Sequence, residues 1–147
     1  MEDSDIMRVE YEVDGENFAS AGEASADVKR ILRQIGLPAD MIRRVTIAMY
    51  EGEINMVIHA RGGVAHVQIA PEKIIIDLID KGPGMPDVEL AMREGYSTAP
   101  DSVRALGFGA GMGLPNMKRY ADDIEVVSEV GVGTSVKLTF TLPAAPG

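Results

Sequence analysis

The chain has 147 residues, the size of one ordinary domain, of which 46% are hydrophobic and 25% are charged. It contains no cysteine, which excludes disulfides and thiolate metal sites, and its net charge of −9 argues against non-specific nucleic-acid binding. No apolar run approaches the roughly 20 residues that span a bilayer, and the acidic start lacks the features of a signal peptide, so we expect a cytoplasmic protein without membrane contact.

The predicted elements follow from hydrophobic periodicity and from the positions of glycine and proline. Gly36 ends the first helix, and Pro71 with Glu72 forms a tight turn between two strands. A glycine- and proline-rich connection separates the two halves of the chain, and its length is typical of a functional loop. The expected strands are 7–13, 64–70, 73–80, 124–130 and 134–142, and the expected helices are 21–35, 39–60, a short one at 87–93, and 114–120.

This order predicts a two-layer α/β sandwich, with a mixed, mostly antiparallel sheet and helices on one face. We expect one domain over 1–147, with a core over about 7–142 and a lid over about 81–110. The strand 73–80 is almost entirely apolar, which predicts a central position covered on both faces.

Glu51 and Asn55 form the first motif with chemical potential, Glu51-x-x-x-Asn55, on the longer predicted helix. Side chains at i and i+4 are neighbours on one helix surface. A carboxylate can accept a proton from a hydroxyl or water, and an amide oxygen is a suitable ligand for Mg2+. Ala48 and Gly52 place only small residues beside this pair, which suggests that something other than the core packs there. The alternative, which this motif alone leaves open, is a solvated helix face carrying Glu51 and Glu53.

Asp80 ends the apolar strand and begins the motif Asp80-x-Gly82-x-Gly84. An acid in this place can accept a hydrogen bond from an exocyclic amine such as the amino group of adenine. The two glycines would let the backbone approach a flat base. The alternative is a plain turn, because aspartate followed by glycine and proline is good turn chemistry.

Glycine alternates with other residues from Gly107 to Gly113, immediately before the last predicted helix. Such a chain can turn several N–H groups toward phosphates, and a helix N-terminus favours negative charge. No Gly-Lys-Ser/Thr follows, so the segment is not a P-loop, and no strand–helix–strand unit surrounds it, so it is not a Rossmann fingerprint. A hinge without a ligand remains the alternative.

Together with Gly133-Thr134, these motifs resemble the nucleotide-binding boxes of the GHKL ATPase superfamily, which shares the Bergerat ATP-binding fold. That superfamily includes DNA gyrase, large heat-shock chaperones, sensor histidine kinases and MutL-type repair proteins. The resemblance covers roughly 28–141. Within the superfamily, the segments 87–98 and 111–117 are similar to the small anti-sigma-factor serine/threonine kinases and to the related stress-switch kinases of bacteria.

The resemblance implies a role for each matching residue. Glu51 would be the general base and Asn55 the Mg2+ ligand, while Asp80 would bind the adenine amine with support from Thr134. Arg104 in the lid would stabilise the transferring phosphate. The other implied ATP contacts shape the pocket and the lid, and they are Gly82, Gly84, Met85, Thr98, Gly109, Gly111, Met112, Gly113 and Leu114. The segment 105–109 looks like an insertion relative to typical anti-sigma kinases.

On this resemblance we expect a serine/threonine protein kinase that uses ATP and Mg2+ to phosphorylate a small anti-anti-sigma-like regulatory protein. The sequence leaves open a sigma factor as a second partner and a homodimer. The alternative function is an ATP-sensing binding module with little or no phosphotransfer. The catalytic half of a histidine kinase is disfavoured, because no hairpin with an acceptor histidine precedes the domain and His59 is expected to cap a carbonyl or to pack.

Overall fold

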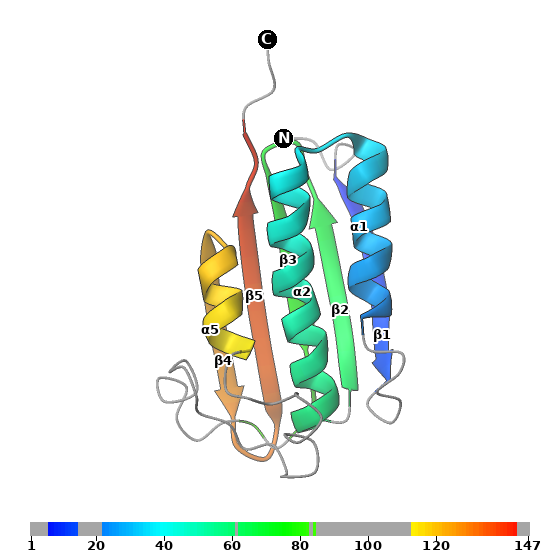
Figure 1. The fold of residues 1–147 in the computed structure, drawn as a ribbon. Helices are drawn as coiled ribbons and strands as arrows, with labels where there is room; N and C mark the ends of the chain where they lie inside the picture. The colour runs from blue at the N-terminus through cyan, green and yellow to red at the C-terminus, as the bar shows by residue number, and fades with distance from the viewer. Residues whose placement is uncertain (1–5, 15–21, 61, 83, 85–112, 144–147) are drawn as a thin grey trace.

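A computed structural model describes residues 6–14, 22–60, 62–82, 84 and 113–143 (Figure 1). The short helix predicted at 87–93 lies outside these residues. The helices are α1 (Glu23–Ile35), α2 (Ala39–Ala60) and α5 (Gly113–Tyr120). The strands are β1 (Met7–Asp14), β2 (Gly62–Ile69), β3 (Lys73–Ile79), β4 (Asp123–Glu129) and β5 (Gly133–Thr141). None of the described helices is long and apolar enough to cross a membrane.

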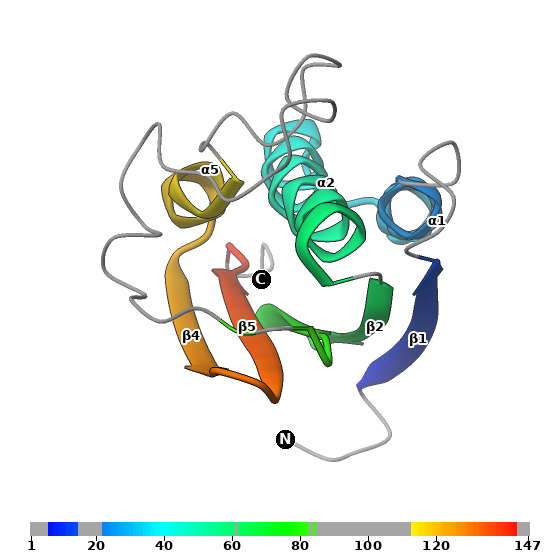
Figure 2. The ribbon, with the colours of Figure 1, turned by 90° about the horizontal axis from the view of Figure 1, so that it is seen from below.

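The five strands form one sheet in the order β1-β2-β3-β5-β4, and each of the four pairings is antiparallel. Figure 2 shows α1, α2 and α5 together on one face of this sheet. The predicted two-layer sandwich is therefore confirmed, and the sheet is antiparallel throughout the described strands rather than mixed.

Strand β3 is central, as its apolar sequence predicted, but the expectation that it is covered on both faces is wrong for the described part of the chain. Ile74, Ile76 and Leu78 point into the core, whereas Ile79 is 38% exposed and Ile75 only half-buried. Successive residues of a strand point to opposite faces, so an apolar run places isoleucines on the open face as well.

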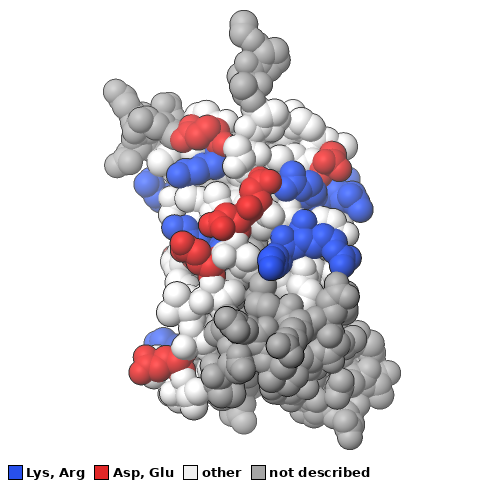
Figure 3. Space-filling model, turned by 90° about the vertical axis from the view of Figure 1, so that its left-hand side faces the viewer, with Lys and Arg blue, Asp and Glu red and all other residues white. Residues whose placement is uncertain are grey.

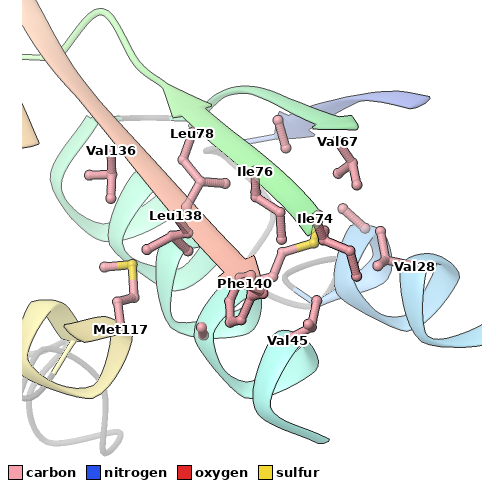
Figure 4. Close-up of a cluster of buried hydrophobic side chains, with 14 of the residues drawn as sticks. Val28, Val45, Val67, Ile74, Ile76, Leu78, Met117, Val136, Leu138 and Phe140 are labelled. Atoms are coloured by element: carbon pink, nitrogen blue, oxygen red, sulfur yellow. The ribbon is translucent and has the colours of Figure 1, made fainter. Parts of the chain in front are cut away.

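The core lies between the sheet and the helices (Figure 4). Ile74, Ile76, Leu138 and Phe140 are fully buried in the sheet, and Val45 of α2 packs against them. Burying each such side chain contributes about 1.5–3 kcal/mol relative to leaving it in water. The core thus fixes α2 across the centre of the sheet, which matters because α2 carries Glu51 and Asn55.

Glu53 of α2 is not on a solvated face, as one interpretation of the sequence had it; it is 2% exposed and holds the first turn of α1. Its Oε2 accepts hydrogen bonds from the backbone N–H groups of Gly22 (3.0 Å) and Ala24 (3.3 Å), and its Oε1 accepts one from that of Ser25 (2.7 Å). The first N–H groups of a helix have no partner inside the helix, and a negative charge is stabilised there. The carboxylate therefore caps α1 from a residue 28 to 31 positions away.

Arg44 and Asp122 fasten α5 to the rest of the molecule. Nε of Arg44 donates to the carbonyl oxygen of Tyr120 at 3.1 Å, and its guanidinium pairs with Asp122 Oδ1 at 3.1 Å. The backbone N–H of Thr141 donates to Asp122 Oδ2 at 2.6 Å. That backbone bond, followed by the pair with Arg44, lowers the pKa of Asp122. The end of α5 is in this way joined to both α2 and β5.

Candidate functional site

The motif residues of the described chain gather at one end of the sandwich. In Figure 1 the end of α2 and the start of β5 lie at the bottom of the view, and α5 begins in its lower half. Glu51 and Asn55 belong to α2, Asp80 directly follows β3, and Thr134 is the second residue of β5. Segments far apart in the sequence are therefore brought to a common edge.

Glu51 is a partly buried carboxylate in the second half of α2. Asn116 of α5 donates from Nδ2 to Glu51 Oε1 at 3.4 Å. Burial raises the pKa of Glu51, and the bond from Asn116 opposes that shift. A carboxyl with a raised pKa is a stronger base once it is ionised, which suits it to accept a proton.

Asn55 lies one turn beyond Glu51 on the same helix surface and is partly exposed. Its amide oxygen is a suitable Mg2+ ligand. Among the described residues, no three His, Cys, Asp or Glu side chains come together to hold a metal. A metal at Asn55 would thus fit the magnesium pattern of one or two protein groups completed by water and substrate phosphates.

The small residues beside Glu51 serve the core, so the expectation that something else packs against them is wrong. Ala48 is fully buried within the core. A Cβ at Gly52 would lie 2.1 Å from Cδ1 of Leu78 and 3.4 Å from Sδ of Met117. A side chain at Gly52 would force Leu78 to shift, because α2 approaches β3 and α5 closely at this point, beside Glu51.

Asp80 makes the turn that the Asp-x-Gly pattern favours. Its Oδ1 accepts hydrogen bonds from the backbone N–H of Gly82 at 2.9 Å and from that of Thr134 at 3.0 Å. The backbone N–H of Asp80 in turn donates to the carbonyl oxygen of Thr134 at 2.9 Å. Among the described residues, both hydrogen bonds that the carboxylate accepts end on Oδ1, which holds it in place while Oδ2 can accept a ligand donor. The turn and the ligand interpretation are therefore compatible.

Gly133 allows β5 to meet the end of β3. A Cβ at Gly133 would lie 2.2 Å from the carbonyl oxygen of Asp80, and its φ of +148° is one that other residues rarely adopt. Thr134 follows, and its Oγ1 shares a 2.8 Å hydrogen bond with Oγ of Ser128 on β4. The Gly133-Thr134 pair therefore seats Asp80 through its backbone, while the Thr134 hydroxyl is held by the neighbouring strand.

Gly63 links the α2 half of the site to the Asp80 half. A Cβ there would lie 2.9 Å from Sδ of Met56, 2.3 Å from the carbonyl oxygen of Ile79 and 3.1 Å from Cα of Asp80. Met56 directly follows Asn55 in α2. The end of α2 and the end of β3 are therefore in close contact at Gly63, which belongs to β2.

Gly84 packs on the turn between β4 and β5. Its φ is +76°, and a Cβ would lie 2.3 Å from the carbonyl oxygen of Glu129. The requirement for glycine here therefore comes from neighbouring backbone. Gly113 is the first residue of α5, and the adjacent Leu114 is 6% exposed and belongs to the core.

Several predicted residues lie outside the described part of the chain. Met117 of α5 is described, and it is 1% exposed within the hydrophobic core. Structure alone also adds two residues whose roles the sequence did not suggest, Asn116 and Glu53, because a side-chain contact between distant segments leaves no local pattern. The predicted site residues outside the description are Met85, Thr98, Arg104, Gly109, Gly111 and Met112, as is the side chain of His59.

Comparison with protein families gives one match over most of the chain. The model of the histidine kinase-like ATPase domain matches residues 16–140. An anti-sigma F factor of Clostridium beijerinckii is 33% identical over 136 residues, covering 88% of this chain and 90% of its own length. The serine/threonine-protein kinase RsbT of Bacillus subtilis is 30% identical over 115 residues, covering 74% of this chain and 79% of its own.

A solved structure supports the same fold. The crystal structure of the RsbU and RsbW domains of a Mycobacterium tuberculosis protein matches 94% of this chain with a TM-score of 0.62. The sequences are 18% identical, and the chain spans 34% of the length of that larger protein. The likeness therefore concerns the fold of one part of it.

Proposed function

This chain belongs to the family of histidine kinase-like ATPase domains, and we propose that it is an ATP-dependent serine/threonine protein kinase acting on a small regulatory protein. The family resemblance predicted from the motifs is thereby confirmed. The names of its relatives, anti-sigma F factor and serine/threonine-protein kinase, support this reaction and this class of partner.

The observation that carries the proposal is the placement of Glu51. The partly buried carboxylate of Glu51, with its raised pKa, lies one helical turn from the partly exposed amide of Asn55, at the edge where Asp80 is held by β5. In the proposed reaction Glu51 accepts the proton of the acceptor hydroxyl, and the oxygen so activated attacks the γ-phosphorus of ATP while the bond to the β-phosphate oxygen breaks. The products are a phosphorylated partner and ADP.

Other residues bind and orient ATP in this proposal. Asp80 accepts a hydrogen bond from the adenine amine, and Arg104 of the lid stabilises charge on the transferring phosphate. Bound through Asn55 and the phosphates, Mg2+ would supply charge neutralisation. We place the protein in the cytoplasm, with an anti-anti-sigma-like substrate and with a sigma factor as a second candidate partner. An ATP-sensing module without phosphotransfer would bind ATP in the same pocket. The two hypotheses differ in one respect, because only the kinase needs Glu51 as a general base.

The first test is magnesium-dependent ATP binding by the wild type and by Asn55→Ala, measured by titration calorimetry. Loss of one oxygen ligand should weaken binding roughly tenfold or more in the presence of Mg2+ and much less in its absence. Gln34→Ala, which removes an exposed amide at the far end of α1, is the matched control and should bind ATP as the wild type does. No binding to the wild type at millimolar ATP would refute the proposal.

The pH dependence of the reaction gives a second prediction. Glu51 must be ionised to accept a proton, and burial raises its pKa, so activity should fall on acidification at a higher pH than the ordinary carboxyl value of about 4.3 allows. Asn116→Leu removes a donor that lowers this pKa, so its acidic limb should move to still higher pH. Asn116→Gln keeps an amide and should shift less. Identical pH–rate profiles for all three proteins would contradict the role of Glu51 as the base.

A further inference from the structure

A groove runs between α1 and α2 on the surface away from the sheet, at the end of the molecule opposite the nucleotide motifs. Its volume is about 450 Å³, and it is half-open to solvent. The apolar part of its lining includes Leu37, Ile42 and Ile47. From Ile42 to Asn55 the helix rises about 20 Å, so the groove is distinct from the site described above.

Three basic side chains also line the groove: Lys29 and Arg33 on α1 and Arg43 on α2. Within the described residues, neither Lys29 nor Arg33 has a salt-bridge partner. Arg43 lies 3.8 Å from Asp40 in a highly exposed pair, which contributes little. A positive groove on a chain of net charge −9 is a local feature that the overall charge does not explain.

The surrounding helical surface is also rich in cations. Figure 3 views the molecule from the side of α5 and β4, and Lys and Arg side chains gather over the helical layer at the right of that view. The described helices carry Lys29, Arg30, Arg33, Arg43, Arg44, Lys118 and Arg119. An approaching acidic partner would therefore be attracted to the helical layer as a whole and would find its apolar contact in the groove.

The chemistry of the groove limits which class of ligand it can bind. A small molecule would be poorly enclosed, because ligand pockets normally bury most of the ligand surface. Nucleic acid is disfavoured by the apolar lining and by the strongly acidic chain. A symmetric contact with a second copy would bring the same three cations face to face. An acidic segment with apolar side chains on one face matches both the lining and the charge.

We propose that the groove between α1 and α2 docks an acidic amphipathic helix of a partner protein, with its apolar side chains against Leu37, Ile42 and Ile47 and its carboxylates at Lys29, Arg33 and Arg43. Helices laid into grooves in this way are a common mode of peptide recognition. The site gives the protein a means of holding a partner that is independent of the nucleotide pocket. Docking therefore does not depend on ATP or on the proposed kinase activity.

The test uses fluorescence anisotropy with the full chain and a labelled helical peptide of about 15 residues, leucines on one face and glutamates flanking them. The groove variant Lys29→Glu/Arg33→Glu should bind this peptide about tenfold more weakly than the wild type, because two attractions become repulsions. Lys73→Glu/Lys137→Glu makes the same change in net charge at exposed residues of the sheet, outside the groove and the helical layer, and should stay within about twofold of the wild type. Asn55→Ala should bind the peptide normally.

A charge-reversed peptide, with lysines in place of the glutamates, distinguishes a loss of charge complementarity from misfolding of the groove variant. It should bind the groove variant more tightly than it binds the control variant of equal charge. Equal binding of the glutamate peptide to both variants would overturn the proposal. Displacement of the peptide by a thymidine oligonucleotide that binds more strongly would also overturn it, because the groove would then be a nucleic-acid site. So would a wild-type dimer in sedimentation that the groove variant abolishes, because the groove would then bind a second copy.

Discussion

Glu53→Ala is expected to destabilise the protein by about 3 kcal/mol, because it leaves three backbone N–H groups at the start of α1 without their acceptor. Each lost bond to a buried, charged acceptor costs on the order of 1–3 kcal/mol, and water entering the vacated space recovers part of it. For a domain of this size the loss corresponds to a fall in Tm of roughly 10 °C. Thermal and urea unfolding followed by circular dichroism would measure both quantities.

Two variants control this prediction. Glu23→Ala also removes an acid at the first turn of α1, but Glu23 is exposed, so its effect should stay within about 1 kcal/mol. Glu53→Gln keeps one oxygen acceptor and should fall between the alanine variant and the wild type. If Glu53→Ala were no less stable than Glu23→Ala, the contact between α2 and the start of α1 would not hold the fold together.

Glu51→Gln is expected to reduce phosphoryl transfer by about 10²–10⁴-fold while leaving ATP binding nearly unchanged, because a general base contributes in that range and the amide cannot accept the proton. Glutamine has the same shape and retains an oxygen for the donor of Asn116, so the local structure should persist. The measurement is transfer of labelled γ-phosphate from ATP to a candidate partner protein, or to water where no partner is present. Binding is measured in parallel by calorimetry.

The pair of measurements separates the two functions that share this pocket. A kinase loses transfer and keeps binding in Glu51→Gln. An ATP-sensing module keeps both its binding and its effect on the partner, because it never needed the base. Glu12→Gln, an exposed carboxylate of β1, is the control for a change of one charge and should be silent.

Glu51 and Glu53 are glutamates two positions apart on α2, and their different neighbours give them different roles. Residues i and i+2 of a helix point to different sides, so Glu53 faces α1 while Glu51 faces α5. The first meets three N–H donors and becomes structural. Among the described residues the second meets the amide of Asn116, and in the proposed function it is the base. The predicted difference between their variants, stability in one and activity in the other, follows from these neighbours.

Much of the fold could be predicted from local pattern. The predicted helix 39–60 coincides with α2, because its apolar residues recur at helical spacing over many turns. The predicted strands differ from the observed ones by one or two residues at their ends. The coverage of β3 could not be predicted in this way, since an apolar run is compatible with burial on one face or on both.

The sequence by itself determined the described elements, their order and the family, because periodicity, turn residues and short motifs are carried by neighbouring positions. It also predicted which residues bind ATP. Only the tertiary structure decided which of these residues meet: that Asn116 touches Glu51, that Glu53 caps a distant helix, and that Gly133 lets Asp80 bond to the start of β5. Such contacts depend on how α2 crosses the sheet, and packing between distant segments leaves no signal at any single position of the chain.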